Sequence, residues 1–330
     1  MLSFPLALVA TTLFLIHVAV AESFTNPLNR VNGSDPFMVY SKGNYYLTVT
    51  GWDHIAITRA KTIEGLKKGE RKVVWRDSTP NRCCEVWAPE MHEFDGVWWI
   101  YYTAGSKGTF GNQRPHVLKG GATPFDKYTY AAQMSGPQGM QNWGIDATVA
   151  TIAKKRYFIW SCKPDLQSVC LGEMSSPTRV SSFTRISKPE LPFEKKGEFP
   201  VNEGPAVMNH GGKTYIAYSA SHCASPAYSL GLLTLKNGAN PLKPESWIKS
   251  PQPVVKSGNG NYGTGHNGFF QGPEGDWWNV YHATKKPGGD CRFDRYTMVS
   301  AVKFDAKGDP IFDQPQPSSK QIEGPKGSGP

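Results

Sequence analysis

Charged side chains are scarce in this sequence, and they form no block of one sign. Asp, Glu, Lys and Arg together make up 19% of the 330 residues, and the formal net charge is +9. The lysines and arginines are scattered, with no basic block and no RNA-reading motif, so the sequence predicts no nucleic-acid partner. The excess of Leu, Ala, Glu and Lys that is typical of a helical bundle is also missing.

Long apolar stretches are missing as well, except at the N-terminus. Residues 4–20 are almost entirely apolar, interrupted by Pro5 and His17, and Ala19-Val20-Ala21 forms a small-x-small cleavage site. No other stretch approaches the roughly 18 apolar residues of a membrane span. The pattern predicts a signal peptide over residues 1–21 and a secreted, extracellular protein without a membrane anchor.

Zinc-binding patterns are absent, because the six cysteines accompany no CxxC or HxxxH motif. In an oxidising compartment these cysteines become candidates for disulfides, and six of them allow 15 pairings, which leaves the connectivity open. Cys162 and Cys170 flank a short polar turn, so we expect them to bridge two neighbouring strands. For the vicinal Cys83 and Cys84, structural pairing is favoured over redox chemistry, since no helix or CxxC setting activates a thiol there.

Turn residues and aromatic residues, in contrast, are abundant. The chain contains 34 Gly and 26 Pro, and 12% of its residues are aromatic. Frequent turn residues between short aromatic runs predict an all-β protein.

Five segments of the chain repeat one plan, in which a polar stretch and a small-residue turn precede an aromatic strand. They are SDPFMVYSKGNYYLTVT (34–50), APEMHEFDGVWWIYYTA (88–104), GIDATVATIAKKRYFIWS (144–161), NEGPAVMNHGGKTYIAYSA (202–220) and GHNGFFQGPEGDWWNVYHA (265–283). Their first aromatic residues, 53 to 62 positions apart, are Tyr45, Trp98, Tyr157, Tyr215 and Trp277. Repeats of this length with several short strands are typical of propeller blades. The sequence therefore predicts a five-bladed β-propeller with four-stranded antiparallel blades around a central channel.

One polar residue recurs 8 to 12 positions before each aromatic anchor. These residues are Asp35, Glu90, Asp146, Glu203 and His266. The first strand of each propeller blade lines the channel, so we expect the five side chains to converge at one end of the axis. Each residue alone has a structural interpretation, such as a turn-forming Asp before Pro, but the shared spacing favours a site. The spacing supports Glu90 least, because its offset is the shortest.

Paired carboxylates around a sugar-sized pocket indicate glycoside hydrolysis. One carboxylic acid protonates the leaving oxygen, and one carboxylate acts at the anomeric carbon. A third carboxylate beside the acid would keep that acid protonated near neutral pH. Trp52, Trp87 and Trp143 lie near these positions and are candidates to stack on sugar faces, with core packing as the alternative for each.

The motifs SDP, WAPE, GIDAT, NEGP and GHNG, each before an aromatic strand, resemble glycoside hydrolase family 43, from about Asn26 to Asp313. This family of five-bladed propellers includes arabinofuranosidases, xylosidases and arabinanases. The text GTGHNGFF followed by WNVYHA is most similar to secreted exo-acting α-L-arabinofuranosidases that attack α-1,5-linked arabinan.

The resemblance implies a role for each candidate residue. Asp35 would be the general base and Glu203 the general acid of an inverting reaction, and Asp146 would raise the pKa of the acid and orient it. Glu90 and Arg295 would bind substrate together with the three tryptophans. His266 would hold a structural calcium ion or a water cluster on the channel axis, and the chemistry itself would need no cofactor.

The resemblance also sets our expectations for domains and substrate. We expect a catalytic propeller over residues 22–313 and a Pro-, Gly- and Ser-rich tail over 314–330 that is disordered or a short extension. The expected substrates are arabinan or arabinose-containing oligosaccharides from pectin side chains, cleaved by a monomer to release L-arabinofuranose. A β-xylosidase, an endo-arabinanase of the same fold and a non-catalytic carbohydrate-binding propeller are the alternatives. The sequon at Asn32 lies close to the proposed base, so we expect it to be unused or to point outward.

Overall fold

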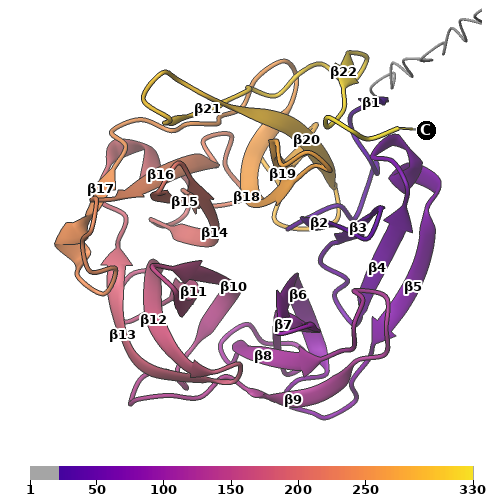
Figure 1. Ribbon diagram of the computed structural model, residues 1–330. Helices are drawn as coiled ribbons and strands as arrows, with labels where there is room; N and C mark the ends of the chain where they lie inside the picture. Colours follow the sequence, from indigo (N-terminus) through magenta and orange to yellow (C-terminus); the bar gives the residue numbers. More distant parts are fainter. Residues whose placement is uncertain (1–21, 330) are drawn as a thin grey trace, which may run out of the picture.

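Five antiparallel sheets surround a central axis in the computed structural model, which describes residues 22–329 (Figure 1). Each sheet consists of four strands that are consecutive in the chain, so the prediction of a five-bladed propeller is confirmed. The predicted signal peptide lies outside the described residues. Among residues 22–329, no helix is both long enough and apolar enough to cross a membrane.

Within each blade, the strands follow one another in chain order from the channel to the outside of the ring. The inner strands are β2 (Phe37–Ser41), β6 (Cys84–Phe94), β10 (Gly144–Ile152), β14 (Asn202–His210) and β18 (Tyr262–Gln271). The second strands are β3 (Asn44–Thr48), β7 (Val97–Gly105), β11 (Lys155–Cys162), β15 (Lys213–Ala220) and β19 (Trp277–Thr284). The third strands are β4 (Ile55–Ala60), β8 (Arg114–Lys119), β12 (Ser168–Ser176), β16 (Ser229–Leu235) and β20 (Arg295–Phe304). The outer strands are β5 (Glu70–Trp75), β9 (Thr129–Gln133), β13 (Arg179–Ser187), β17 (Trp247–Lys249) and β21 (Pro310–Phe312). Three short 3₁₀ helices complete the secondary structure, namely η1 (Glu64–Lys68), η2 (Pro192–Glu194) and η3 (Pro244–Ser246).

Apolar packing between adjacent blades forms the core of the ring. Five apolar clusters lie one at each blade-to-blade interface, and the five predicted aromatic anchors, all on second strands, contribute to four of these clusters. Between the last and the first blade, the ring of Tyr45 meets the ring of Phe270 edge-on, with centroids 6.1 Å apart. Because one blade cannot bury both of its faces, each sheet depends on its two neighbours for burial of apolar surface.

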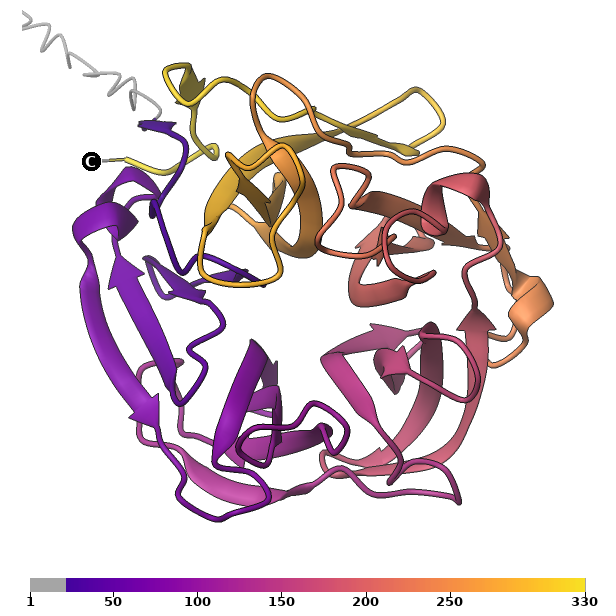
Figure 2. The same cartoon turned by 180° about the vertical axis from the view of Figure 1, so that it is seen from behind.

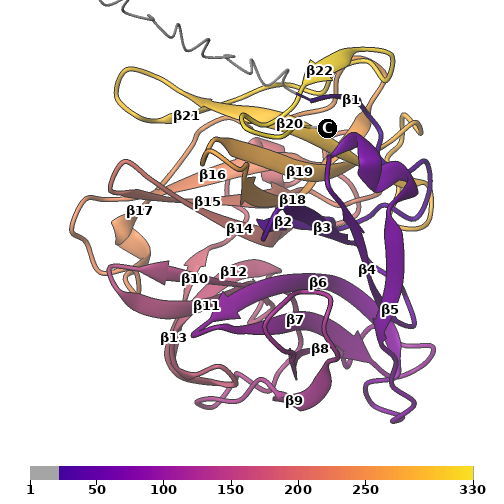
Figure 3. The ribbon, with the colours of Figure 1, turned by 45° about the vertical axis from the view of Figure 1, so that its right-hand side comes forward.

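The two ends of the chain meet at one edge of the ring, as the rear and oblique views show (Figures 2 and 3). β1 (Ser23–Thr25) pairs antiparallel with β22 (Gln321–Glu323) in a separate two-stranded sheet. Of the two expectations for the tail, the ordered extension is therefore the one observed. No strand is shared between the first and last blades described, so this small sheet and the apolar interface between those blades close the ring.

A shared backbone feature occurs near the start of every inner strand. An equivalent residue in each blade adopts a left-handed conformation, namely Asp35 (φ 53°), Ala88 (φ 45°), Asp146 (φ 57°), Gly204 (φ 51°) and His266 (φ 42°). In blades two to five, the pairing of the inner strand with the second strand shifts register at this point. A bulge of this kind re-aims the local side chain, and left-handed backbone at a non-glycine residue costs roughly 1–3 kcal/mol. The strained backbone thus lies at the end of the channel where the polar residues were predicted to meet.

Three disulfides account for all six cysteines, and the described chain has no free cysteine. Cys162–Cys170 joins β11 to β12, which confirms the predicted bridge between neighbouring strands. Cys83 and Cys84 bond to each other. Cys223–Cys291 ties the loop after β15 to the loop between β19 and β20, and so connects the fourth blade to the fifth.

Candidate active site

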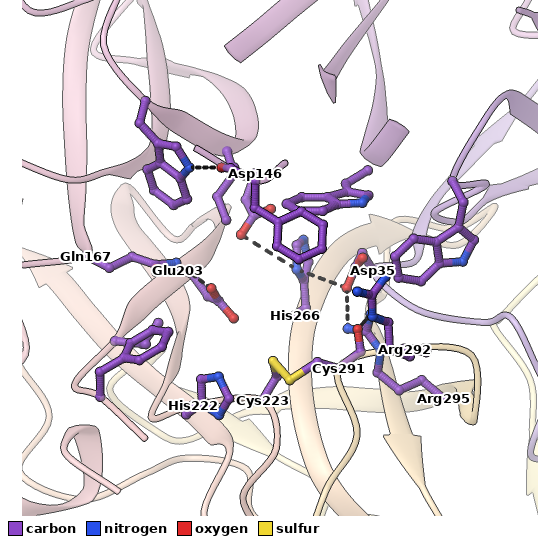
Figure 4. Close-up of a pocket in the computed structure, with 17 residues that line it drawn as sticks. Asp35, Asp146, Gln167, Glu203, His222, Cys223, His266, Cys291, Arg292 and Arg295 are labelled. Carbon is purple, nitrogen blue, oxygen red and sulfur yellow. Dashed lines mark hydrogen bonds and ion pairs between the residues drawn. A yellow bond between two sulfur atoms is a disulfide. The ribbon is translucent and has the colours of Figure 1, made fainter. Parts of the chain in front are cut away.

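A pocket of about 260 Å³ at one end of the channel gathers carboxyl groups from three blades (Figure 4). Asp35 reaches it from the residues before β2, Asp146 from β10 and Glu203 from β14. The predicted convergence of these three residues is confirmed. A pocket of this size suits one small polar ligand rather than a long stretch of polymer.

Asp35 accepts hydrogen bonds from two side chains and lies beside two histidine rings. Arg295 donates from Nη1 to Oδ1 at 2.9 Å, and the Thr50 hydroxyl donates to Oδ2 at 2.6 Å. The Nδ1 atoms of His266 and His282 lie 3.3 and 3.4 Å from Oδ1. Burial by itself would raise the pKa of Asp35, but the charges of Arg295 and His266 and the contact with His282 hold it well below its usual range. Asp35 is therefore an ionised carboxylate throughout the neutral pH range.

Glu203 has a different environment on the opposite side of the pocket. The Tyr228 hydroxyl donates to Oε1 at 2.8 Å. The Gln167 amide donates to Oε2 at 2.5 Å (Figure 4). Burial raises the pKa of Glu203 to about 7, the negative charge of Asp35 adds to this, and the two hydrogen bonds oppose it. A substantial fraction of Glu203 is thus protonated near neutral pH.

Asp146 lies between the other two carboxyl groups and is itself buried. Burial, followed by the charges of Glu203 and Asp35, raises the pKa of Asp146 well above its usual range. The sequence analysis expected Asp146 to raise the pKa of Glu203, whereas burial is the largest cause of that shift in the structure. Asp146 instead accepts a hydrogen bond at Oδ2 from the backbone N–H of Gly204 at 3.1 Å. This contact fixes the backbone immediately beside Glu203.

Two features favour glycine at position 204. Its φ of 51° lies in the left-handed region, and an added Cβ would come 3.0 Å from Cγ of His266. The tight contact brings the strand of Glu203 against the ring of His266, at the centre of the pocket floor.

The three predicted tryptophans and Arg295 all line the pocket. Trp52, Trp87 and Trp143 are half-buried and belong to none of the apolar clusters described above. The structure therefore places them as pocket walls, and core packing is not their role. The Nε1 of Trp143 donates to the carbonyl of Phe110 at 2.8 Å, which orients its ring along the wall.

Glu90 is the candidate that the structure does not bring into the site. Its carboxylate faces Nε2 of His92 at 2.9 Å, and it is not among the residues that line the pocket. The left-handed residue of the second blade is Ala88, so Ala88 is the structural equivalent of Asp35 and Asp146. Counting back from the aromatic anchor missed the bulge and selected a residue two positions farther along β6.

The described side chains around His266 do not supply the shell of a calcium ion. Ca²⁺ takes six to eight oxygen ligands, whereas His266 offers ring nitrogen, and its Nδ1 faces Asp35 and Asp146 at 3.3 and 3.9 Å. Within residues 22–329, the one cluster of three potential metal ligands is His222, Cys223 and Cys291. Its two sulfur atoms are joined in a disulfide, so it is not a metal centre. Calcium at His266 stays a prediction.

Several residues of the site were missed by sequence reasoning. Gln167 and Tyr228 donate hydrogen bonds to Glu203, while Phe110, Phe199 and Arg292 form part of the wall. All five lie in loops outside the repeated motifs. For Gln167 the one available signal was its place in the loop that Cys162 and Cys170 close.

Comparison with known proteins agrees with this geometry. A family model described as "Glycosyl hydrolases family 43" matches residues 24–310. The chain belongs to glycosyl hydrolases family 43. Within family 43, a solved structure similar to this chain is an α-L-arabinofuranosidase from Lactobacillus brevis, with a TM-score of 0.81 and 31% identity. That match covers 90% of this chain and 98% of the other.

Two family 43 relatives match over most of this chain. An extracellular exo-α-(1→5)-L-arabinofuranosidase of Streptomyces avermitilis is 34% identical over 310 residues, which cover 89% of this chain and 64% of that protein. An α-L-arabinofuranosidase of Humicola insolens is 33% identical over 319 residues, which cover 91% of this chain and 66% of that protein. The chain therefore spans slightly less than two thirds of the length of these two relatives.

Proposed function

We propose that this protein is a secreted α-L-arabinofuranosidase that releases L-arabinofuranose from α-1,5-linked arabinan or arabino-oligosaccharides with inversion. The observation that carries the proposal is the pair of opposite pKa shifts in one pocket, with Asp35 ionised and Glu203 protonated in part near pH 7. Glycoside hydrolysis requires two carboxyl groups whose environments separate their pKa values. The names of the Lactobacillus, Streptomyces and Humicola relatives support arabinofuranose as the sugar released.

The proposed reaction uses one water molecule and two proton transfers. Asp35 accepts a proton from water as the water oxygen bonds to the anomeric carbon, and the bond from that carbon to the leaving oxygen breaks. Glu203 gives its proton to the leaving oxygen. Asp146 keeps the backbone beside Glu203 in place, and Arg295 keeps Asp35 charged. Solvent returns the proton from Asp35 to Glu203 before the next turnover.

Secretion is part of the proposal and has two supports. The Streptomyces relative is named extracellular, and three disulfides persist only where the surroundings are oxidising. The expected polymer is arabinan, including the arabinan side chains of pectin.

Hydrolysis of two aryl glycosides tests the sugar specificity. We expect the protein to hydrolyse an aryl α-L-arabinofuranoside and to prefer it to the matching aryl β-D-xyloside, because the Lactobacillus, Streptomyces and Humicola relatives are named arabinofuranosidases. Proton NMR of products from linear α-1,5-arabino-oligosaccharides should show β-arabinofuranose first, since inversion reverses the α configuration. A preference for the xyloside contradicts the proposed specificity, and α-arabinofuranose as the first product contradicts inversion.

Replacing Gln167 should shift the pH profile rather than merely lower the rate. The Gln167 N–H stabilises the ionised form of Glu203, so Gln167→Met raises the pKa of that carboxyl group. The acid is active in its protonated form, so kcat/KM falls as pH rises through the pKa of Glu203. A higher pKa moves this alkaline limb of the kcat/KM profile to higher pH. We expect a shift of about one pH unit, the size of one hydrogen bond to a charged group.

Two further variants separate this positioning role from a structural one. Tyr228→Phe removes the other donor and should shift the limb in the same direction, whereas Gln252→Met, at an exposed glutamine in the fourth blade, should leave it unchanged. An unmoved limb in Gln167→Met, with an equal loss of kcat/KM at every pH, would contradict the assignment.

A further inference from the structure

Two cations lie over the aromatic walls of the pocket. The guanidinium carbon of Arg292 is 5.5 Å from the ring centroid of Trp52 and 5.1 Å from that of Phe110. Nζ of Lys163 is 5.8 Å from both the Trp143 and the Phe199 rings. All four rings line the pocket, so each cation spans two wall residues. These six residues are called the rim below.

The rim faces solvent at the mouth, outside the carboxyl groups. Arg292 and Lys163 are exposed, and Phe110 and Phe199 are 46% and 39% exposed although they are large apolar side chains. With arabinofuranose held against the carboxyl groups, the part of the substrate beyond the scissile bond has to leave through this mouth. The rim is therefore the surface that the leaving group meets.

Neither rim cation is neutralised by a carboxylate of the protein. Among the ion pairs of residues 22–329, none includes the side chain of Arg292 or Lys163, while acidic groups in the same loops have other partners. Asp165 pairs with Arg185, and Asp290 and Asp294 pair with Lys286. Glu198 lies 3.7 Å from Nε2 of His222, a histidine whose pKa is lowered by burial. Two exposed positive charges thus remain available at the mouth.

The carboxyl groups of the floor do not require these cations either. Asp35 already has Arg295 at 2.9 Å. Burial raises the pKa of Asp146 well above its usual range and that of Glu203 to about 7, so part of the Glu203 population is uncharged near neutral pH. The rim therefore carries two positive charges that these carboxyl groups do not need, on an aromatic surface.

We propose that the rim binds a carboxylate on the leaving part of the substrate, so that the preferred substrates carry a uronic acid next to the arabinofuranose. The exposed rings of Phe110 and Phe199 offer flat apolar faces to the sugar ring of that uronic acid. Lys163 and Arg292 offer its carboxylate N–H donors, and Arg292 matches the fork of a carboxylate. This inference rests on the proposed function, because it concerns the leaving group of that reaction.

The test compares two disaccharides, an arabinofuranosyl hexuronic acid and its uronate methyl ester, which differ in the negative charge and in one methyl group. We expect the wild-type protein to show the higher kcat/KM for the acid. Lys163→Met and Arg292→Met should each lower the acid-to-ester ratio by about two- to fivefold, the size of an exposed ion pair. Raising the salt concentration should lower the wild-type ratio, since exposed charges are screened. The matched control is Lys119→Met, which removes a lysine 5.7 Å above the Trp99 ring, away from the pocket, and should leave the ratio unchanged.

The outcomes separate this inference from the proposed function. Equal kcat/KM ratios in wild type, Lys163→Met and Arg292→Met would overturn the inference while leaving the hydrolase intact, as would an equal loss in Lys119→Met. If the wild-type protein cleaves neither these disaccharides nor the aryl α-L-arabinofuranoside, the proposed function fails. In that case, calorimetric binding of the same two compounds tests the role of the rim. We expect the wild-type protein to bind the acid more tightly than the ester, and both rim variants to lose that preference.

Discussion

Asparagine in place of Asp35 should lower kcat/KM for every arabinofuranoside by about 10²- to 10⁴-fold, the usual contribution of a general base. The amide of Asp35→Asn cannot accept a proton from water, whatever the leaving group. The loss should therefore be as large for an activated aryl arabinofuranoside as for an arabino-oligosaccharide. Steady-state kinetics on both substrates provide the measurement.

Stability has to be measured alongside activity, because Asp35 is one half of a buried ion pair. Removing its charge leaves the buried guanidinium of Arg295 without a countercharge, and breaking such a pair costs about 3–5 kcal/mol. Asp35→Glu keeps the charge and moves the carboxylate by one methylene group, so it should retain most of the stability and still lose most of the activity. Asp95→Asn, at an exposed aspartate in the turn between β6 and β7, is the control and should behave as wild type. Wild-type kcat/KM in Asp35→Asn would remove Asp35 from the mechanism.

The fold could be predicted because buried aromatic residues recur once in each repeat. Tyr45, Tyr157 and Tyr215 each lie on the second strand of a blade and are almost fully buried, so the packing between blades demands a large apolar side chain at that point of every repeat. Their spacing therefore reports the size of a blade and the number of blades. The tail carries no such signal. Its Pro-, Gly- and Ser-rich composition left disorder and a short extension both open, because composition does not encode the backbone hydrogen bonds by which β22 pairs with β1.

Site residues could be predicted only where the bulge did not disturb the spacing between the polar residue and the aromatic anchor. Asp35, Asp146 and His266 are themselves the left-handed residues of their blades, so they share one position. Glu203 stands one residue before the left-handed Gly204, and its longer chain still reaches the pocket. Glu90 stands two residues after Ala88, on the far side of the register shift, and its carboxylate faces His92 instead. Side chains alternate along a strand, so a bulge that varies in position cannot be located from spacing alone.

The loop residues could not be predicted, because their positions depend on contacts between blades. Arg292 follows Cys291, whose bond to Cys223 carries the loop of the fifth blade to the fourth, and that pairing was one of 15 possibilities. The backbone carbonyls of Arg292 and Cys291 in turn accept hydrogen bonds from the Arg295 guanidinium, at 3.2 and 3.0 Å. The disulfide therefore helps to place the arginine that keeps Asp35 charged, a dependence visible only in three dimensions.

Glutamine in place of Glu203 should separate the acid from the base through the leaving group. Departure of a sugar alcohol needs a proton from Glu203, so Glu203→Gln should lower kcat/KM for arabino-oligosaccharides by about 10²- to 10⁴-fold. A dinitrophenolate leaves without protonation, so hydrolysis of 2,4-dinitrophenyl α-L-arabinofuranoside should fall by less than about tenfold. The alkaline limb of kcat/KM, set in the wild-type protein by the pKa of about 7 at Glu203, should also disappear.

The matched control for Glu203→Gln is Glu245→Gln, at an exposed glutamate of η3 in the same blade, which should leave both substrates and the pH profile unchanged. Equal losses on the oligosaccharide and the dinitrophenyl substrate would show that Glu203 does not act by protonating the leaving oxygen. An alkaline limb that persists in Glu203→Gln would move the titrating group to Asp146, whose pKa burial and its carboxylate neighbours also raise. The dependence on the leaving group thus identifies the acid. Only the carboxyl group that protonates the leaving oxygen becomes dispensable when that oxygen needs no proton, and the pocket contains three candidates.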